Sequence, residues 1–523
     1  MAEPSWPTKR TTLGLFALFL LLTLISQGAS LQGEFLFDDI PTLVENDCHR
    51  GFDKIPQLFR LDANNVCTGR PLRYISFMLD HALWGERTVG YHLHNLVLHA
   101  TCALLLLLLV SQLTRRHFTH HRHLALLSAL IFLLHPITTE AVSYISGRRD
   151  LLMAFFSLLA VLCYLRQSRW SLLLSPLLLL CALLSHESAI MLPVVLLFAE
   201  GVMNRGEIKD SLRAVSLRLA PLFTVSAAFG LFTLLARNSS TRTELWGANV
   251  GAHLGTVARV HWRYLEQIFY PVEQQADYSP RAFELSTAIS EPRSALALLA
   301  LLLLLGVASW WLLKKRHALA ALVLGYFALL FPSSHLLAVH HELAAEHRLY
   351  LPLALLSPLI GAALLWGLQK LASVRLRGTL VLAFLGTLGM LTAFRSSDWV
   401  SNEALWRTTV TQAPNCARAR TNLGAVYARQ GRFYLAQSHL MLAAALRPDF
   451  CAAHLNLGHV QLDLGFRKAG VATLKRALRC QQTPSYFRAL AKAQLRVGQL
   501  AAAARTLELA RRAYPSRFRG KGP

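Results

Sequence analysis

The sequence predicts an all-α membrane protein in which a bundle of about eleven transmembrane helices is followed by a soluble α-solenoid. Two observations support this fold class. Of the 523 residues, 54% are hydrophobic, and they gather in stretches of about 17 to 22 residues, the length that crosses about 30 Å of hydrocarbon. After residue 410 these stretches end, and short motifs recur with a period of 34 residues.

The apolar stretches all lie in the first 398 residues. They run over residues 12–30, 91–112, 124–141, 151–166, 170–186, 188–204, 214–236, 294–313, 318–337, 349–369 and 378–395. The stretches near 151 and 170 are short, so nine to twelve spans are compatible with the pattern. The first stretch is long for the apolar part of a signal peptide and has no convincing cleavage site, so we expect an uncleaved helix.

The orientation follows from the basic residues in the short loops. With a cytoplasmic amino terminus, these residues all fall on the cytoplasmic side: Arg115, Arg116, Arg122, Arg166, Arg169, Arg205, Lys209, Arg213, Lys314, Lys315, Arg316, Lys370, Arg375 and Arg377. Eleven spans then place a first loop (33–90) and the carboxyl-terminal domain on the external face. The composition, rich in Leu, Ala and Arg, favours a bacterial inner membrane with a periplasmic repeat domain. An endoplasmic-reticulum membrane with a lumenal repeat domain is the alternative.

The carboxyl-terminal repeats have the tetratricopeptide period of two antiparallel helices per unit. Asn422-Leu423-Gly424 returns as Asn456-Leu457-Gly458, and a degenerate third copy runs from about Pro484 to Pro515. We therefore expect a membrane domain over residues 1–398, about three repeats over 399–516 and a basic tail over 517–523. The concave side of such an array usually receives an extended peptide, although the repeats could instead only cap or rigidify the membrane domain.

The net charge of +24 comes mainly from this carboxyl-terminal part. From residue 400 onward, 20 Lys and Arg stand against four acids, a net charge of +16. An external location favours anionic lipid headgroups or an acidic glycan over nucleic acid as the partner, with a solvated basic surface as the alternative. Among the eight cysteines, Cys48 and Cys67 share the first external loop and could form a disulfide in an oxidising compartment.

An acid pair, Asp38 and Asp39, follows the first predicted span. A carboxylate that is shielded from bulk water near a membrane can have its pKa raised toward the working pH and act as a general base. The repulsion between two adjacent carboxylates separates their proton affinities further. The alternative is a turn-forming Asp pair before Pro41.

Other ionisable residues lie at the external ends of the spans, where such groups usually face a cavity or a partner. The candidate donor-binding residues are His135, Glu140, Arg148, Arg149, Glu346, Arg348 and Tyr350. Arginine binds phosphate and pyrophosphate through its planar donor fork. Together with apolar walls, these side chains predict a site for a lipid donor that carries a phosphate.

Metal and nucleotide chemistry are not expected. His341-Glu342-Leu343-Ala344-Ala345 lacks the second histidine of a zinc-protease helix, and the sequence has no phosphate-binding Gly-rich loop. We therefore expect no cofactor and no metal, with the lipid-linked sugar acting as a substrate.

In this order along the chain, the motifs resemble those of the transmembrane and tetratricopeptide-repeat O-mannosyltransferase family. They are Phe-Asp-Asp at 37–39, Gly-Arg-Pro-Leu at 69–72, Tyr-His-x-x-Asn at 91–95, His-Pro-x-x-x-Glu at 135–140, Ser-Gly-Arg-Arg-Asp at 146–150, Asp-Tyr at 277–278, Leu-Tyr-Leu-Pro at 349–352, and Asp398-Trp399 with Glu403. Two departures leave the sugar open: His347 separates Glu346 from Arg348, and His186-Glu187 stands where Lys-Glu is common.

The resemblance implies a GT-C type glycosyltransferase that takes a sugar from a polyprenyl phosphate and inverts the anomeric centre. It implies that Asp38 or Asp39 deprotonates the acceptor hydroxyl, with Asp38 narrowly preferred. Arg148 or Arg149 would hold the donor phosphate, close to Glu346 and Arg348. The acceptor would be protein Ser or Thr, or a surface glycan. The alternative function is a non-catalytic scaffold, in which the membrane part anchors a peptide-binding repeat domain.

Overall fold

The chain was analysed as a computed structural model, which describes residues 7–59, 70–115, 120–203, 208–236, 245–279, 282–315, 317–336 and 342–515. Its α-helices are α1 (Lys9–Gln27), α2 (Ile55–Leu58), α3 (Pro71–Trp84), α4 (Thr88–Thr114), α5 (His121–Leu134), α6 (Thr139–Ser143), α7 (Arg148–Arg166), α8 (Arg169–Ser185), α9 (Leu192–Met203), α10 (Ile208–Ala236), α11 (Val250–Phe269), α12 (Pro292–Lys315), α13 (Ala318–Leu330), α14 (Tyr350–Leu368), α15 (Val374–Asp398), α16 (Asn402–Gln412), α17 (Ala417–Arg429), α18 (Phe433–Leu446), α19 (Cys451–Asp463), α20 (Arg467–Cys480), α21 (Pro484–Arg496) and α22 (Leu500–Ala513). Short 3-10 or π turns link them: η1 (Gly28–Gln32), η2 (Ile40–Val44), η3 (Asp47–His49), η4 (Phe52–Lys54), η5 (Pro136–Thr138), η6 (Ile145–Gly147), η7 (Glu187–Met191), η8 (Phe331–Ser333) and η9 (Glu346–Leu349). The described residues contain no β-strand, so the predicted all-α fold is confirmed.

The chain forms two compact units. Unit 1 comprises residues 1–274 and 285–401, and unit 2 comprises residues 275–284 and 402–523. The membrane domain was expected to end at residue 398, three residues before the end of unit 1. The tail expected at 517–523 lies outside the described residues, as do Cys67 and Gly69.

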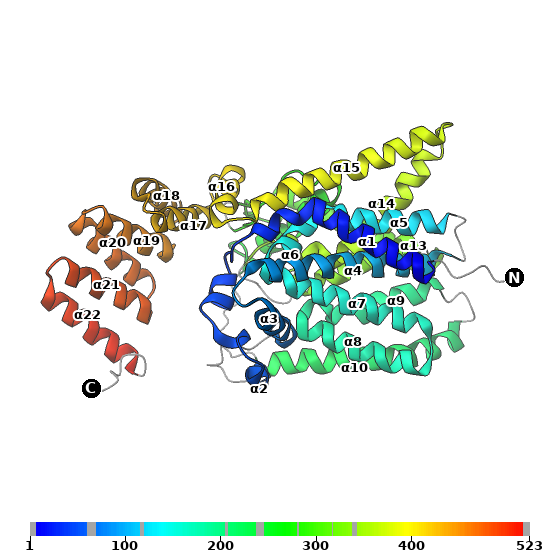
Figure 1. Cartoon of the computed structure of the whole chain (residues 1–523), viewed down its shortest axis with the longest axis horizontal. Helices are drawn as coiled ribbons and strands as arrows, with labels where there is room; N and C mark the ends of the chain where they lie inside the picture. The colour runs from blue at the N-terminus through cyan, green and yellow to red at the C-terminus, as the bar shows by residue number, and fades with distance from the viewer. Residues whose placement is uncertain are drawn as a thin grey trace. The chain divides into compact units, whose positions relative to one another are not determined.

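Unit 1 is a helical bundle, and its end with α2, α3 and α6 is called the polar end (Figure 1). Helix α4 packs against α1, α5 and α7, while α7 packs against α8 and α5 packs against α14. Figure 1 shows the amino terminus and the α14–α15 turn at one end of this unit, and α2, α3 and α6 at the other. The basic termini of α1 and α15 therefore lie opposite the loop that holds the acid pair, as the sequence predicted.

Each of the eleven predicted apolar stretches contains a helix, and the chain is a multi-pass membrane protein. Six helical segments among the described residues are long and apolar enough to span a bilayer. A seventh is possible if the pair α5 and α6, bent by 54°, is one span. The bend follows His135-Pro136, where proline removes a helix hydrogen bond. Helices α8, α9 and α13 have only 17, 12 and 13 residues, so the count of eleven spans stays a prediction.

Unit 2 contains three helical hairpins, α17–α18, α19–α20 and α21–α22. The first helices of the hairpins begin 34 and 33 residues apart, which matches the predicted period. A Cβ atom at Gly424 would lie 2.6 Å from Leu440, and one at Gly458 would lie 2.6 Å from Leu474. The repeated glycines therefore allow the two helices of each hairpin to approach closely.

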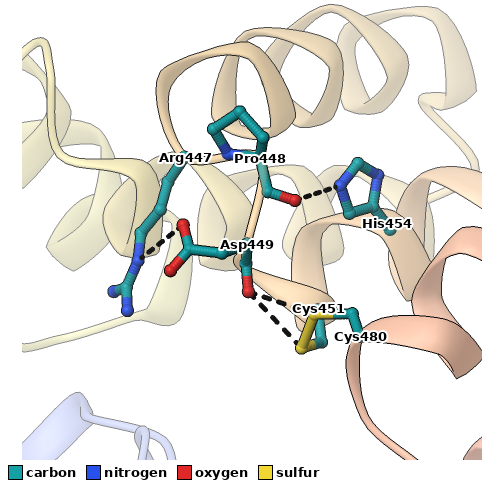
Figure 2. The surroundings of a disulfide bond; sticks show 6 residues. All are labelled: Arg447, Pro448, Asp449, Cys451, His454 and Cys480. Atoms are coloured by element: carbon teal, nitrogen blue, oxygen red, sulfur yellow. Dashed lines mark hydrogen bonds and ion pairs between the residues drawn. A yellow bond between two sulfur atoms is a disulfide. The ribbon is translucent and has the colours of Figure 1, made fainter.

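Unit 2 also contains two features that the sequence analysis did not indicate. Segment 275–284, between α11 and α12, belongs to it, and Asp277 in this segment accepts hydrogen bonds from Arg418, one of them at 2.8 Å. In addition, Cys451 and Cys480 form a disulfide that joins the start of α19 to the end of α20 (Figure 2). Figure 2 also shows the preceding turn, where His454 donates to the Pro448 carbonyl at 2.8 Å.

Candidate active site

The two carboxylates of the acid pair have different surroundings. The pair lies in the loop between η1 and η2, at the polar end of unit 1. Asp38 is exposed, whereas Asp39 is fully buried. Only Asp38 can therefore meet a substrate from solution without a rearrangement of the loop.

Asp39 connects its loop to the segment that begins α7. Its Oδ1 accepts hydrogen bonds from the Ser146 backbone N–H at 2.9 Å and from the Ser146 hydroxyl at 2.5 Å. Its Oδ2 accepts from the Leu36 backbone N–H at 3.0 Å. Burial and, to a smaller extent, the charge of Asp38 raise the pKa of Asp39, these hydrogen bonds lower it, and the net result is a pKa of about 7. Asp39 is thus placed to hold structure rather than to reach a substrate.

Asp38 is held at its backbone. Its N–H donates to the Tyr144 hydroxyl at 2.9 Å. The preceding residue, Phe37, has a φ of 42°, in the left-handed region that costs a non-glycine residue free energy. The chain therefore turns sharply just before the pair, and this turn exposes one carboxyl group while burying the next.

Tyr144 links the acid pair to the predicted motif Asp398-Trp399 and, through Arg395, to Glu346. Its ring lies 5.4 Å from that of Trp399, and the Arg395 guanidinium lies 5.7 Å from the Trp399 ring centroid. Arg395 also forms ion pairs with Glu346 at 3.2 Å and Asp398 at 3.1 Å. Glu346 is fully buried, so its contact with Arg395 balances a charge that would otherwise be costly inside the protein.

Tyr144 also shows that the acid pair and Arg149 act on the same place. Burial raises the pKa of the Tyr144 phenol well above its usual value, and the charges of Asp39 and Asp38 add to the effect. The guanidinium of Arg149 acts in the opposite direction. Charges of both signs therefore act on this hydroxyl.

Arg148 and Arg149 differ as clearly as the two aspartates. Arg148 is fully buried and forms an ion pair with Asp80 at 2.8 Å. It also donates to the Asn95 side chain and to the Tyr91 carbonyl, the latter at 2.7 Å. Because these contacts occupy its guanidinium, Arg148 ties α7 to α3 and α4. Of the two predicted arginines, Arg149 is the one whose guanidinium is partly exposed.

Arg149 is partly exposed and contacts the residue that interrupts the predicted Glu-Arg pair. Its Nη2 donates to His347 Nε2 at 2.9 Å. Because that nitrogen accepts, the proton of a neutral His347 lies on Nδ1 and is donated to Glu140 Oε1 at 2.7 Å. The His347 backbone N–H also donates to Glu140, at 2.9 Å. His347 thus orients Arg149 and brings Glu140, one of the predicted residues, into the same network.

Two further arginines extend this basic region, and the sequence analysis assigned neither of them to the site. Arg73 on α3 is buried, and its Nε has no hydrogen-bond partner among the described residues. Burial lowers the pKa of Arg73, and the nearby charges of Arg70 and Arg149 lower it further. Arg70 forms an ion pair with Glu187 at 3.0 Å. The positive charges of Arg70 and Arg149 therefore both act on Arg73, while Glu187 pairs with Arg70 and Asp150 pairs with Arg149.

The other predicted residues serve the framework around this site. His135 donates from Nε2 to the Ile268 carbonyl at 2.8 Å. Arg348 donates to the Glu342 carbonyl at 3.0 Å. Tyr350 donates to His99 Nδ1 at 2.7 Å inside the bundle. These contacts fix the three side chains within the bundle, and their predicted contact with a donor stays a prediction.

The sequence of the chain is similar to those of several named proteins. No family model matches the chain. It is 26% identical over 441 residues to protein O-mannosyl-transferase F38B6.6 of Caenorhabditis elegans. The matched region covers 82% of this chain and 62% of that protein. It is 27% identical over 513 residues to human protein O-mannosyl-transferase TMTC1, with 86% and 57% of the two chains covered. The Drosophila melanogaster protein O-mannosyl-transferase Tmtc1 is 27% identical over 535 residues, covering 82% and 61%.

The predicted resemblance is therefore confirmed, because each of these relatives is named a protein O-mannosyl-transferase. The chain spans about three fifths of the length of these curated relatives. All three are animal proteins, so they give no support to the bacterial origin that the composition favoured.

Proposed function

We propose that this chain is a membrane glycosyltransferase that transfers a hexose from a polyprenyl-phosphate donor to hydroxyl groups of proteins. The names of its relatives favour mannose as the sugar and proteins as the acceptors. One observation carries the proposal: an exposed Asp38 stands at the same end of the bundle as an arginine cluster formed by Arg70, Arg73 and Arg149. A base and an anion site at the same end of the bundle are what transfer from a phosphate-linked sugar requires.

In the proposed reaction, Asp38 accepts the proton of a Ser or Thr hydroxyl as its oxygen attacks the anomeric carbon. The bond between that carbon and the phosphate oxygen breaks, and the polyprenyl phosphate leaves with the electron pair. Attack from the face opposite the phosphate inverts the anomeric centre. Asp39 keeps the loop in place by its hydrogen bonds to Ser146 and Leu36.

The arginine cluster would neutralise the phosphate as negative charge develops on the leaving oxygen. Arg149 is the central member, since His347 and Glu140 orient it from one side. Asp150 lies 3.3 Å from its Nε. A guanidinium held in this way loses little side-chain entropy when it binds a phosphate. The apolar helices beside it would receive the polyprenyl chain.

The disulfide Cys451–Cys480 supports an external repeat domain, because structural disulfides persist in oxidising compartments. Given animal relatives, we place the chain in the endoplasmic reticulum membrane with unit 2 in the lumen. The repeats would present an extended acceptor segment to the membrane unit.

Mass spectrometry of glycopeptides tests the proposal in cells. Cells that lack this chain are complemented with the wild type, with Asp38→Asn, or with Asp53→Asn, which changes an exposed acid of the same loop. We expect hexosylated Ser and Thr peptides to return with the wild type and Asp53→Asn, and to stay absent with Asp38→Asn at equal membrane expression. Full glycosylation with Asp38→Asn would remove the proposed base. No dependence of glycosylation on the chain would instead favour the non-catalytic scaffold.

A further inference from the structure

A cluster of three metal-ligating side chains lies in the first external loop, apart from the proposed active site. It consists of His49 at the end of η3, His81 near the end of α3, and Glu86 in the turn between α3 and α4. One ligand atom from each residue lies within 4.8 Å of the other two. Three separate segments of the loop therefore converge on a volume the size of a metal site.

His49 has no partner to account for its position. It is fully buried, and neither ring nitrogen has a hydrogen-bond partner among the described residues. A buried polar group without a partner costs free energy, so native structures rarely keep one without a reason. Its ring meets that of His81 edge to face, with the centroids 5.3 Å apart.

The spacing of the other two ligands is close to that of a zinc site. His81 Nε2 lies 3.7 Å from Glu86 Oε1. Ligand atoms bound at about 2.0–2.1 Å in a tetrahedron are about 3.4 Å apart, so this pair needs a shift of only a few tenths of an ångström, and the His49 ring must close any remaining gap within the 4.8 Å cluster. Two imidazoles and one carboxylate favour Zn²⁺ over Ca²⁺ or Mg²⁺, which prefer oxygen ligands alone.

We propose that His49, His81 and Glu86 bind a Zn²⁺ ion, with water at the fourth position. Arg50 lies 3.4 Å from Glu86 and 2.7 Å from Asp47. It can keep Asp47 as its ion-pair partner when Glu86 turns to the metal. The ion joins η3 to α3 and to the turn that enters α4, and so fixes the loop that also holds the acid pair. This site is additional to the proposed transfer reaction.

The zinc content of the purified full-length chain tests this assignment. The chain is prepared in detergent without a polyhistidine tag, in a background where His120, His121 and His123 are changed to Gln to remove a second histidine-rich loop. After dialysis against metal-free buffer, we expect one equivalent of zinc. His81→Ala and Glu86→Gln, at partly or fully exposed positions, should each lower zinc affinity at least about tenfold. Glu45→Gln and His459→Ala, at exposed residues outside the cluster, should retain one equivalent.

Two further readouts separate coordination from folding. Added Zn²⁺ should raise the Tm of the background protein but not that of His81→Ala, because only a folded protein with an intact site binds the ion. X-ray absorption should show a shell of nitrogen and oxygen atoms at about 2.0–2.1 Å that includes imidazole. A background protein that retains no zinc and shows no Tm shift would overturn the proposal. Equal zinc retention in His81→Ala and Glu86→Gln would overturn it as well.

Discussion

Asp38 and Asp39 are adjacent in the chain, yet their surroundings give them different chemistry. The left-handed Phe37 turns the backbone so that Asp38 is exposed while Asp39 contacts Ser146. The sequence identified the pair as the candidate base and could not separate the members on its own. Ser146, whose hydrogen bond distinguishes Asp39 from Asp38, lies 107 residues away in the chain. No local sequence pattern indicates that these two segments meet.

The pKa of Asp39 predicts a pH-dependent stability. Burial holds the pKa of Asp39 in the folded protein at about 7, above the 3.8 of an ordinary aspartate, so protonation favours the folded state. That contribution is complete below about pH 4 and is lost as the pH rises through 7, with an upper limit of about 4 kcal/mol. Asp39→Asn removes it, so the Tm of the variant relative to wild type should increase between pH 5 and pH 8. A difference in Tm that is constant with pH would contradict this assignment.

Arg149 should determine donor affinity. Arg149→Lys keeps the charge but loses the planar fork, so we expect the KM for the polyprenyl-phosphate donor to rise about 10- to 100-fold. The KM for the acceptor should not change. Arg169→Lys, at an exposed position at the start of α8, is the control for basic charge. Equal effects of the two variants on donor KM would exclude a specific phosphate contact.

At the scale of elements, the apolar stretches and the 34-residue period located most helices, because both depend only on local sequence. Helix α11 was missed because Arg259, Arg263 and Glu266 interrupt its apolar residues. The disulfide Cys451–Cys480 was also missed, although a signal existed. In a helical hairpin the first residue of one helix and the last of the next lie at the same end, and both positions are cysteines here.

The hairpin glycines predict a packing effect. A Cβ at Gly458 meets Leu474 at 2.6 Å and the Gly470 carbonyl at 3.1 Å, so Gly458→Ala should destabilise the chain by about 1–3 kcal/mol. Gly386→Ala is the matched control, since a Cβ on this α15 residue has nothing within 4 Å. Thermal unfolding of the full-length protein in detergent compares the two. Equal Tm values for both variants would show that the hairpins have more room than the structure indicates.

At the scale of the whole molecule, the distribution of basic loops predicted that the starts of α1 and α15 lie opposite the loop with the acid pair. Unit 1 has this arrangement (Figure 1). Arg395, at the end of α15, was assigned to no site by the sequence. It pairs with Glu346 across 49 residues, so only the folded bundle reveals this contact.

The disulfide offers a direct check of compartment. We expect Cys451 and Cys480, in protein from intact cells, to resist a maleimide mass tag under denaturing conditions until a reductant is added. Cys416 in the same unit is free and should be tagged without reduction once the protein is unfolded. Immediate tagging of all three cysteines would place unit 2 in a reducing compartment and contradict the lumenal assignment.

The most direct test of the central claim is the rate of sugar transfer by purified Asp38→Asn protein, with synthetic polyprenyl-phosphate mannose and a Ser/Thr acceptor. Loss of a general base should lower kcat by about 10²- to 10⁴-fold, with donor KM and Tm close to those of the wild type. Asp53→Asn should transfer at the wild-type rate. An Asp38→Asn protein as active as Asp53→Asn would contradict the account, because no other exposed carboxylate is assigned to the reaction.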